Sequence, residues 1–288
     1  MSPRLAWLLP LVTIAVVCVM VPLSRGTTDE EGVELLFALA FVTYATVGAL
    51  IATRHPHNPV GWLFAALGLG SAITETLYAY AAREVDGGAG PSHTAAAWVS
   101  ATVGEAGFVL LVLLLLLFPD GRFLSKRWRA VGGGAIALGV VWSVATALEP
   151  GPISGPETVD NPLGLRAADE LLGFVTAAAF AAFLLLVLVG AASVFVRYRA
   201  TGSEQRQQIK WLAIAAVFAI AAFLAVAVVG LFTDTDSGVG DVVTALLVGS
   251  AIIAFPLGAA FAILRHRLYD IDVVIKRTLV YGSLTAML

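Results

Sequence analysis

The chain has 288 residues, of which 59% are hydrophobic and only 13% are charged, whereas soluble domains carry roughly a quarter charged residues. This composition excludes an ordinary water-soluble domain and predicts a protein whose main partner is the lipid bilayer, with no nucleic-acid partner. The single cysteine, Cys18, excludes a disulfide framework and a thiolate metal site within one chain.

Apolar runs dominate the chain from its first residues, and a transmembrane helix needs about 20 such residues. Eight runs meet this requirement: Leu5 to Ser24, Val33 to Thr53, Gly61 to Ala82, Thr94 to Phe118, Ala130 to Leu148, Leu171 to Val196, Trp211 to Phe232 and Val242 to Leu264. A ninth run begins near Leu279. The predicted fold class is therefore all-α, a polytopic helical membrane bundle of eight complete spans over residues 1–264 plus the start of a ninth over residues 279–288.

The basic residues predict the orientation of these spans. Fourteen of the 17 Lys and Arg residues fall in one alternating set of connections, and only Arg25, Arg83 and Arg166 fall in the other. By the positive-inside rule the N-terminus is cytoplasmic. An even number of spans then returns the segment from Arg265 onward to the cytoplasm, as its basic residues also indicate.

Two acidic residues interrupt the apolar spans. At about 1.5 Å per residue, Glu75 lies about 21 Å from Gly61 and Glu105 about 20 Å from Phe118, so the two reach matching depths on antiparallel neighbours. A charged carboxylate at mid-bilayer costs at least about 2.5 kcal/mol, so each is expected to face the bundle interior, protonated or paired. One hypothesis is a sensing pair for protons, an ion or a small ligand. The alternative is interhelical hydrogen bonding with the hydroxyls of Thr74, Thr76, Ser100 and Thr102.

Other motifs carry no recognisable catalytic or metal chemistry. His55 and His57 flank a proline without further ligands, and a metal site needs three or four. The run VGGGAIALG (Val131 to Gly139) lacks the Lys of a phosphate loop and predicts a close-packing helix face. Two copies of N-P-x-G, Asn58 to Gly61 and Asn161 to Gly164, predict turns. We predict no catalytic, cofactor or metal site in this chain.

The segment RLYDIDVVIKRTLVYG predicts an amphipathic helix at the inner membrane surface, over residues 265–278. Apolar residues recur at helical spacing, and Asp272 can pair with Lys276 four residues on. Such a helix fits a coupling element or a mere interfacial anchor equally well. The candidate coupling residues are Leu268, Asp270, Ile271, Asp272, Ile275, Lys276 and Arg277.

This segment resembles the juxtamembrane stretch of the actinobacterial multi-span sensor histidine kinases of two-component systems. Further stretches that resemble the family, in its order, are HNPVGWLF, LFPDGRFLSKRW, VDNPLGL and EQRQQIKWLA. Lys276 stands where the family more often has asparagine. These motifs mark the membrane region, and membrane-only relatives share them.

The resemblance implies the membrane sensory and anchoring region of a sensor kinase in the bacterial inner membrane. It implies a homodimer, a cognate response regulator as partner, and ATP and magnesium only in kinase domains missing here. Because the ten residues from Leu279 to Leu288 cannot cross the bilayer, we expect a chain truncated before those domains. The alternatives are a membrane-only scaffold or regulator and, third, a transporter that uses Glu75 and Glu105.

Overall fold

The protein is described by a computed structural model over residues 6–24, 33–83, 90–153, 159–200 and 238–264, with isolated positions between 210 and 225. The described elements are α2 (Leu8–Ser24), α3 (Val33–Arg54), α4 (Pro59–Ala81), α5 (Pro91–Leu117), α6 (Lys126–Leu148), the short 3-10 helix η1 (Arg166–Ala168), α7 (Asp169–Ala200) and α9 (Gly238–Leu264). No described residue belongs to a regular β-strand. The all-α prediction is therefore confirmed over this part of the chain.

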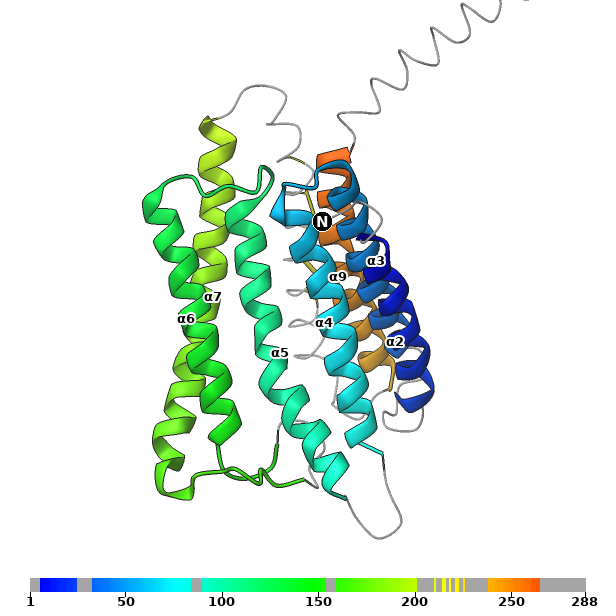
Figure 1. Cartoon of the computed structure of the whole chain (residues 1–288), viewed down its shortest axis with the longest axis vertical. Coiled ribbons are helices and arrows are strands. Elements are labelled where there is room, and N and C mark those ends of the chain that lie inside the picture. The colour runs from blue at the N-terminus through cyan, green and yellow to red at the C-terminus, as the bar shows by residue number, and fades with distance from the viewer. Residues whose placement is uncertain are drawn as a thin grey trace, which may run out of the picture.

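The helices form a bundle of nearly parallel and antiparallel rods, shown in Figure 1. Helices α6 and α7 pair on one side, α5 lies in the middle, and α4, α3, α2 and α9 gather on the other side. One end of the bundle holds the α3–α4 and α5–α6 connections with Arg122, Lys126 and Arg127, and we call it the basic end. The opposite end holds the α6–α7 connection with Glu149 and Asp160, and we call it the acidic end.

Five of the described helices are long and apolar enough to cross a membrane, namely α3, α4, α5, α6 and α7. Helix α2 and the stretch Ile252–Ala262 of α9 are apolar but shorter. Large apolar side chains on the outer faces of α6 and α7, such as Val140 and Leu188, are exposed, as expected where a helix meets lipid. The predicted seventh span lies mostly outside the described residues, and residues 265–288 lie wholly outside them.

Helix starts depart from the predicted spans where a capping residue begins the helix ahead of the apolar run. Helix α4 begins at Pro59 because Asn58 is its N-cap, with the side chain accepting a hydrogen bond from the amide of Val60. Helix α6 begins at Lys126, immediately after its N-cap Ser125. The first turn of α6 therefore holds basic residues that the apolar run from Ala130 did not include.

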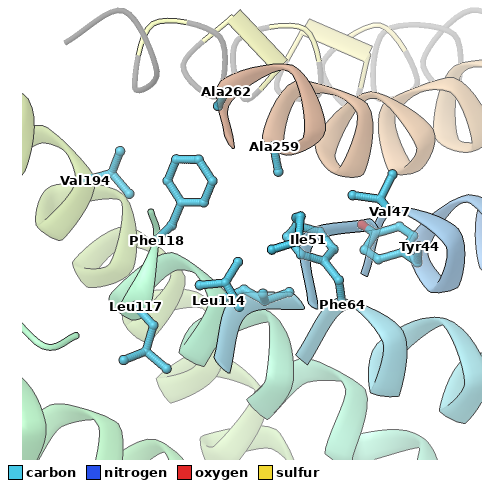
Figure 2. Packing of buried hydrophobic residues seen from close by; sticks show 11 residues of the cluster. Tyr44, Val47, Ile51, Phe64, Leu114, Leu117, Phe118, Val194, Ala259 and Ala262 are labelled. Atoms are coloured by element: carbon cyan, nitrogen blue, oxygen red, sulfur yellow. The ribbon is translucent and has the colours of Figure 1, made fainter. Parts of the chain in front are cut away.

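The largest buried cluster ties five helices together. In Figure 2, Tyr44, Val47 and Ile51 of α3 and Phe64 of α4 lie near Leu114 of α5 and Ala259 of α9. The other members of the cluster are Val60, Leu117, Phe118, Val194 and Ala262. Because α7 contributes Val194 and α9 contributes Ala259 and Ala262, a shift of any one of these helices displaces side chains that the others contact.

Helix α5 serves two cores at once. Leu114 and Leu117 belong to the cluster just described, whereas Val112 and Leu116 pack with Trp142 of α6 and Phe183 of α7. Alternate faces of one helix thus join the α6–α7 pair to the rest of the bundle.

Glycines set the closest helix approaches. A Cβ atom on Gly61 of α4 would lie 2.6 Å from the amide nitrogen of Ala52 of α3, so only glycine fits there. The glycine run of α6 was predicted to form a close-packing face, and only some of its glycines do so. Gly132 packs on Phe123 and Gly139 on Val109, whereas the surface above Gly133 and Gly134 is open.

Candidate functional site

The structure brings Glu75 and Glu105 to one cavity inside the bundle, of about 490 Å³. We call it the carboxylate cavity. Helices α3, α4 and α5 supply most of its walls, and Ile252 of α9 completes the described lining. The residues that line it are Phe37, Phe41, Tyr44, Leu67, Gly68, Ser71, Thr74, Glu75, Gly104, Glu105, Gly107, Phe108, Leu111 and Ile252.

Helical periodicity aims both carboxylates at this space. On α4, Gly68, Ser71 and Glu75 recur three and four residues apart and so share one face of the helix. On α5, Glu105 and Phe108 share a face in the same way. Because α4 and α5 pack side by side, the two faces meet. Whether the two residues form a sensing pair stays a prediction.

One oxygen of the Glu105 carboxyl group lacks a partner in the part of the chain that the structure describes. Its Oε2 atom is buried and, among the described residues, accepts and donates no hydrogen bond. The described lining of the carboxylate cavity also contains no Lys, Arg or His. A carboxyl oxygen buried with neither a cation nor a hydrogen-bond donor is costly to keep, so this arrangement needs a reason other than stability.

The packing alternative expects the neighbouring hydroxyl groups to bond from one helix to another. The bonds that they donate among the described residues stay within one helix. Thr74 donates to the carbonyl groups of Gly70 and Ser71, and Thr76 donates to that of Ala72. Ser100 donates to the carbonyl of Ala97. The hydroxyl of Thr102 is buried without a partner among the described residues. Three of these four hydroxyls therefore donate within their own helices, and interhelical bonding of the carboxyl groups stays an alternative to the sensing pair.

Aromatic rings form much of the apolar wall. The rings of Phe37 and Phe41 stack with centroids 6.2 Å apart. Phe108 stacks on Trp142 of α6, with centroids 5.3 Å apart and an interplanar angle of 6°. These contacts hold the ring of Phe108 in place from outside the cavity, so the wall is preorganised.

A second buried polar site lies at the basic end, and it was missed in the sequence. Arg197 of α7 is 5% exposed. Its guanidinium group donates to the carbonyl of Leu116 over 2.7 Å and to the carbonyl of Arg122, and it lies 3.9 Å from the carboxylate of Asp120. In the sequence Arg197 resembles one more basic residue after a span, but its side chain turns back into the bundle.

The two motif loops at the basic end meet each other. The side-chain amide of Asn58 donates to the carbonyl of Pro119 over 2.8 Å. Gly121 has a φ of 71°, and a Cβ atom there would collide with Asn58 and Pro59, so only glycine suits this turn. We call Asn58, Pro119, Asp120, Gly121 and Arg197 the basic-end junction. The paired N-P and P-D-G turn motifs are the sequence signal for it.

The second N-P-x-G motif organises the acidic end. Asn161 donates to the carbonyls of Ala147 and Glu149 over 3.0 and 2.7 Å, which are carbonyls that the end of α6 leaves without a helical partner. The indole of Trp98 on α5 also donates to Ala147, over 3.0 Å. A small polar cavity of about 130 Å³ lies beside these contacts and reaches Thr102.

Other predicted site residues have different outcomes. The seven candidate coupling residues, from Leu268 to Arg277, lie outside the described residues. Over the described part of the chain, no group of three or more His, Cys, Asp or Glu side chains is arranged to hold a metal ion.

Comparison with known proteins does not assign this chain to a family. No protein-family model, no curated protein and no solved structure matches this chain. The functional reading therefore rests on the geometry of the carboxylate cavity and on the motifs in the sequence.

Proposed function

We propose that this chain is the membrane sensory and anchoring region of a two-component sensor histidine kinase in the bacterial inner membrane. In this proposal the chain has eight spans and a cytoplasmic N-terminus, and it acts as a homodimer. A stimulus received in the carboxylate cavity is passed to cytoplasmic kinase domains of the same polypeptide, which phosphorylate a response regulator using ATP and magnesium.

The observation that carries the proposal is the carboxylate cavity itself. It places two acidic side chains between helices that share a core with the rest of the bundle, and one carboxyl oxygen has no partner among the described residues. Evolution rarely retains ionisable groups inside a membrane without a functional use. A cavity of this kind suits a receptor site better than a simple anchor.

Helix α9 offers the route from the cavity toward the cytoplasm. Ile252 lines the cavity, and α9 ends twelve residues later at Leu264, about 18 Å along the helix axis. The segment from Arg265 to Arg277, with its amphipathic pattern, follows directly. A ligand that contacts Ile252 therefore acts on the same helix that precedes the candidate coupling segment, and it can bias the balance between two packings of that helix.

The course of α4 and α5 favours a sensor over a transporter. Transporters commonly break their helices where the substrate binds near the middle of the membrane. Both α4 and α5 continue without interruption past Glu75 and Glu105. A membrane-only scaffold of the same family remains the second candidate, because it would share every motif quoted above.

Phosphate transfer separates the kinase from the scaffold. The protein made from its complete reading frame is embedded in membranes and incubated with ATP labelled on the γ-phosphate. Labelling of a histidine beyond residue 288 is the expected result. A protein that takes up no label, with a known sensor kinase labelled in the same membranes, would contradict the kinase proposal and favour the scaffold.

A further inference from the structure

We propose that the carboxylate cavity binds an organic cation with an apolar body, such as an amphipathic amine or a quaternary ammonium compound. This inference deepens the proposed function, on which it rests, by naming the chemical class of the stimulus. It is drawn from the charge, the size and the wall chemistry of the cavity.

The charge of the site calls for a cation. Two carboxyl groups face the same space, and the described lining supplies no basic side chain to balance them. The buried Oε2 of Glu105 has no hydrogen-bond donor among the residues that the structure describes. A ligand that brings a positive charge, or several N–H donors, would compensate both groups at once.

The walls favour an organic cation over a bare metal ion. Calcium takes six to eight oxygen ligands and magnesium takes six in near-ideal octahedral geometry. The described lining offers two carboxyl groups on separate helices and the hydroxyl-bearing residues Tyr44, Ser71 and Thr74, and its other side chains are apolar. An ion in this cavity would keep much of its water against an apolar wall, which is unfavourable.

The rings and the volume match an apolar body. Phe37, Phe41, Tyr44 and Phe108 present aromatic faces or edges to the cavity, and aromatic faces attract ammonium groups, as in known quaternary ammonium sites. A volume of about 490 Å³ lies within the roughly 300–1,000 Å³ of typical small-molecule sites. The ligand therefore combines one positive end near the carboxylates with an apolar remainder against the rings.

A pair of probes that differ only in charge tests the proposal. Benzyltrimethylammonium and its neutral carbon isostere, neopentylbenzene, have the same shape. Binding of each is measured by equilibrium dialysis to the whole protein, made from its complete reading frame and held in lipid nanodiscs, against empty nanodiscs. We expect saturable binding of the ammonium compound and only partition into lipid for the isostere.

Two kinds of variant locate the binding. Glu75→Gln and Glu105→Gln, which keep the side-chain shape, are each expected to weaken binding about tenfold or more. Glu170→Gln, in the first turn of α7 outside the cavity, is the matched control and leaves binding unchanged. Gly104→Leu fills the cavity without meeting any atom at its Cβ position and abolishes binding, whereas Gly70→Leu is equally open but lines no part of the cavity and has no effect.

The outcomes decide the ligand class independently of the kinase proposal. Equal binding of the two probes, or unchanged binding in both glutamine variants and in Gly104→Leu, would overturn the organic-cation site. Because dialysis needs no ATP, saturable cation binding by a protein that takes up no phosphate would keep the ligand class and reject the kinase. Phosphate labelling without cation binding would keep the kinase proposal and reject the ligand class.

Discussion

The carboxylate cavity holds two half-buried acidic side chains and the basic-end junction holds one buried basic side chain, and the two sites bond these side chains differently. At the junction, Arg197 donates to two backbone carbonyls and lies beside Asp120. In the cavity, Glu105 has a buried oxygen with no partner among the described residues. The bundle thus gives the Arg197 guanidinium two carbonyl acceptors, although its Nε has no partner among the described residues, and gives Oε2 of Glu105 none in that part of the chain.

The difference distinguishes a charged group that stabilises the fold from one that can bind a ligand. A buried charge that is bonded to atoms of other elements holds those elements together, and removing it leaves its partners without a donor. A half-buried carboxyl group with an oxygen that the described residues leave unpartnered, as in Glu105, contributes little to stability and is available to a ligand. Arg197 is therefore expected to be needed for folding, whereas the two carboxylates are expected to be dispensable for it.

The largest expected effect is the loss of the Arg197 guanidinium. Arg197→Met keeps the apolar stem but leaves the carbonyls of Leu116 and Arg122 without their donor, so the free energy of unfolding is expected to fall by about 3 kcal/mol. Unfolding in mixed SDS micelles, followed by circular dichroism, measures it. The control is Arg199→Met, which removes only an exposed contact 4.9 Å from the ring of Phe195 and is expected to cost no more than about 1 kcal/mol. Equal losses in the two variants would mean that the junction is not structural.

Intermediate effects are expected at the two N-P-x-G motifs. Asn161→Ala removes donations to Ala147 and Glu149 and is expected to cost about 2 kcal/mol. Asn58→Ala removes one donation to Pro119 and the N-cap of α4, and it is expected to lower the free energy of unfolding by about 1 kcal/mol.

The same unfolding measurement, applied to an Asn58→Asp variant, separates the two roles of the Asn58 side chain. Asn58→Asp keeps the acceptor that caps α4 and loses only the donor, so it is expected to be less harmful than Asn58→Ala. If Asn58→Asp is as unstable as the alanine variant, the bond to Pro119 rather than the cap holds this end together.

The smallest effect on stability, and one of opposite sign, is expected in the cavity. Glu105→Gln replaces an unpaired carboxyl group by a neutral amide of the same shape, so the free energy of unfolding is expected to stay constant or rise by up to about 1 kcal/mol. A loss approaching that of Arg197→Met would show that the carboxylate is structural after all, and the contrast between the two sites would collapse.

The sequence predicted the helices and the two carboxylates for simple physical reasons. Long apolar runs must be helical in a membrane, because every backbone group has to be bonded within its own segment. Counting at a constant rise per residue put Glu75 and Glu105 at similar depth on neighbouring helices, and both line one cavity. Both inferences need only local periodicity.

The basic-end junction escaped prediction because it depends on which loops meet. Nothing local indicates that the side chain of Arg197 reaches the carbonyls of Leu116 and Arg122, more than seventy residues away in the sequence. The contact of Asn58 with Pro119 is equally remote. The direct bonding of Thr74 and Thr76 to their own helices was also missed, since a membrane hydroxyl can bond within its helix or across to another.

The most direct test of the central claim is the response of phosphate labelling to benzyltrimethylammonium in the wild type and in the Glu75→Gln, Glu105→Gln double variant. The whole protein is assayed in membranes, and the ratio of labelling with and without the cation is compared. We predict a ratio that differs from one in the wild type and equals one in the double variant. A double variant that responds to the cation as the wild type does would contradict the claim that the carboxyl groups of the cavity receive the stimulus.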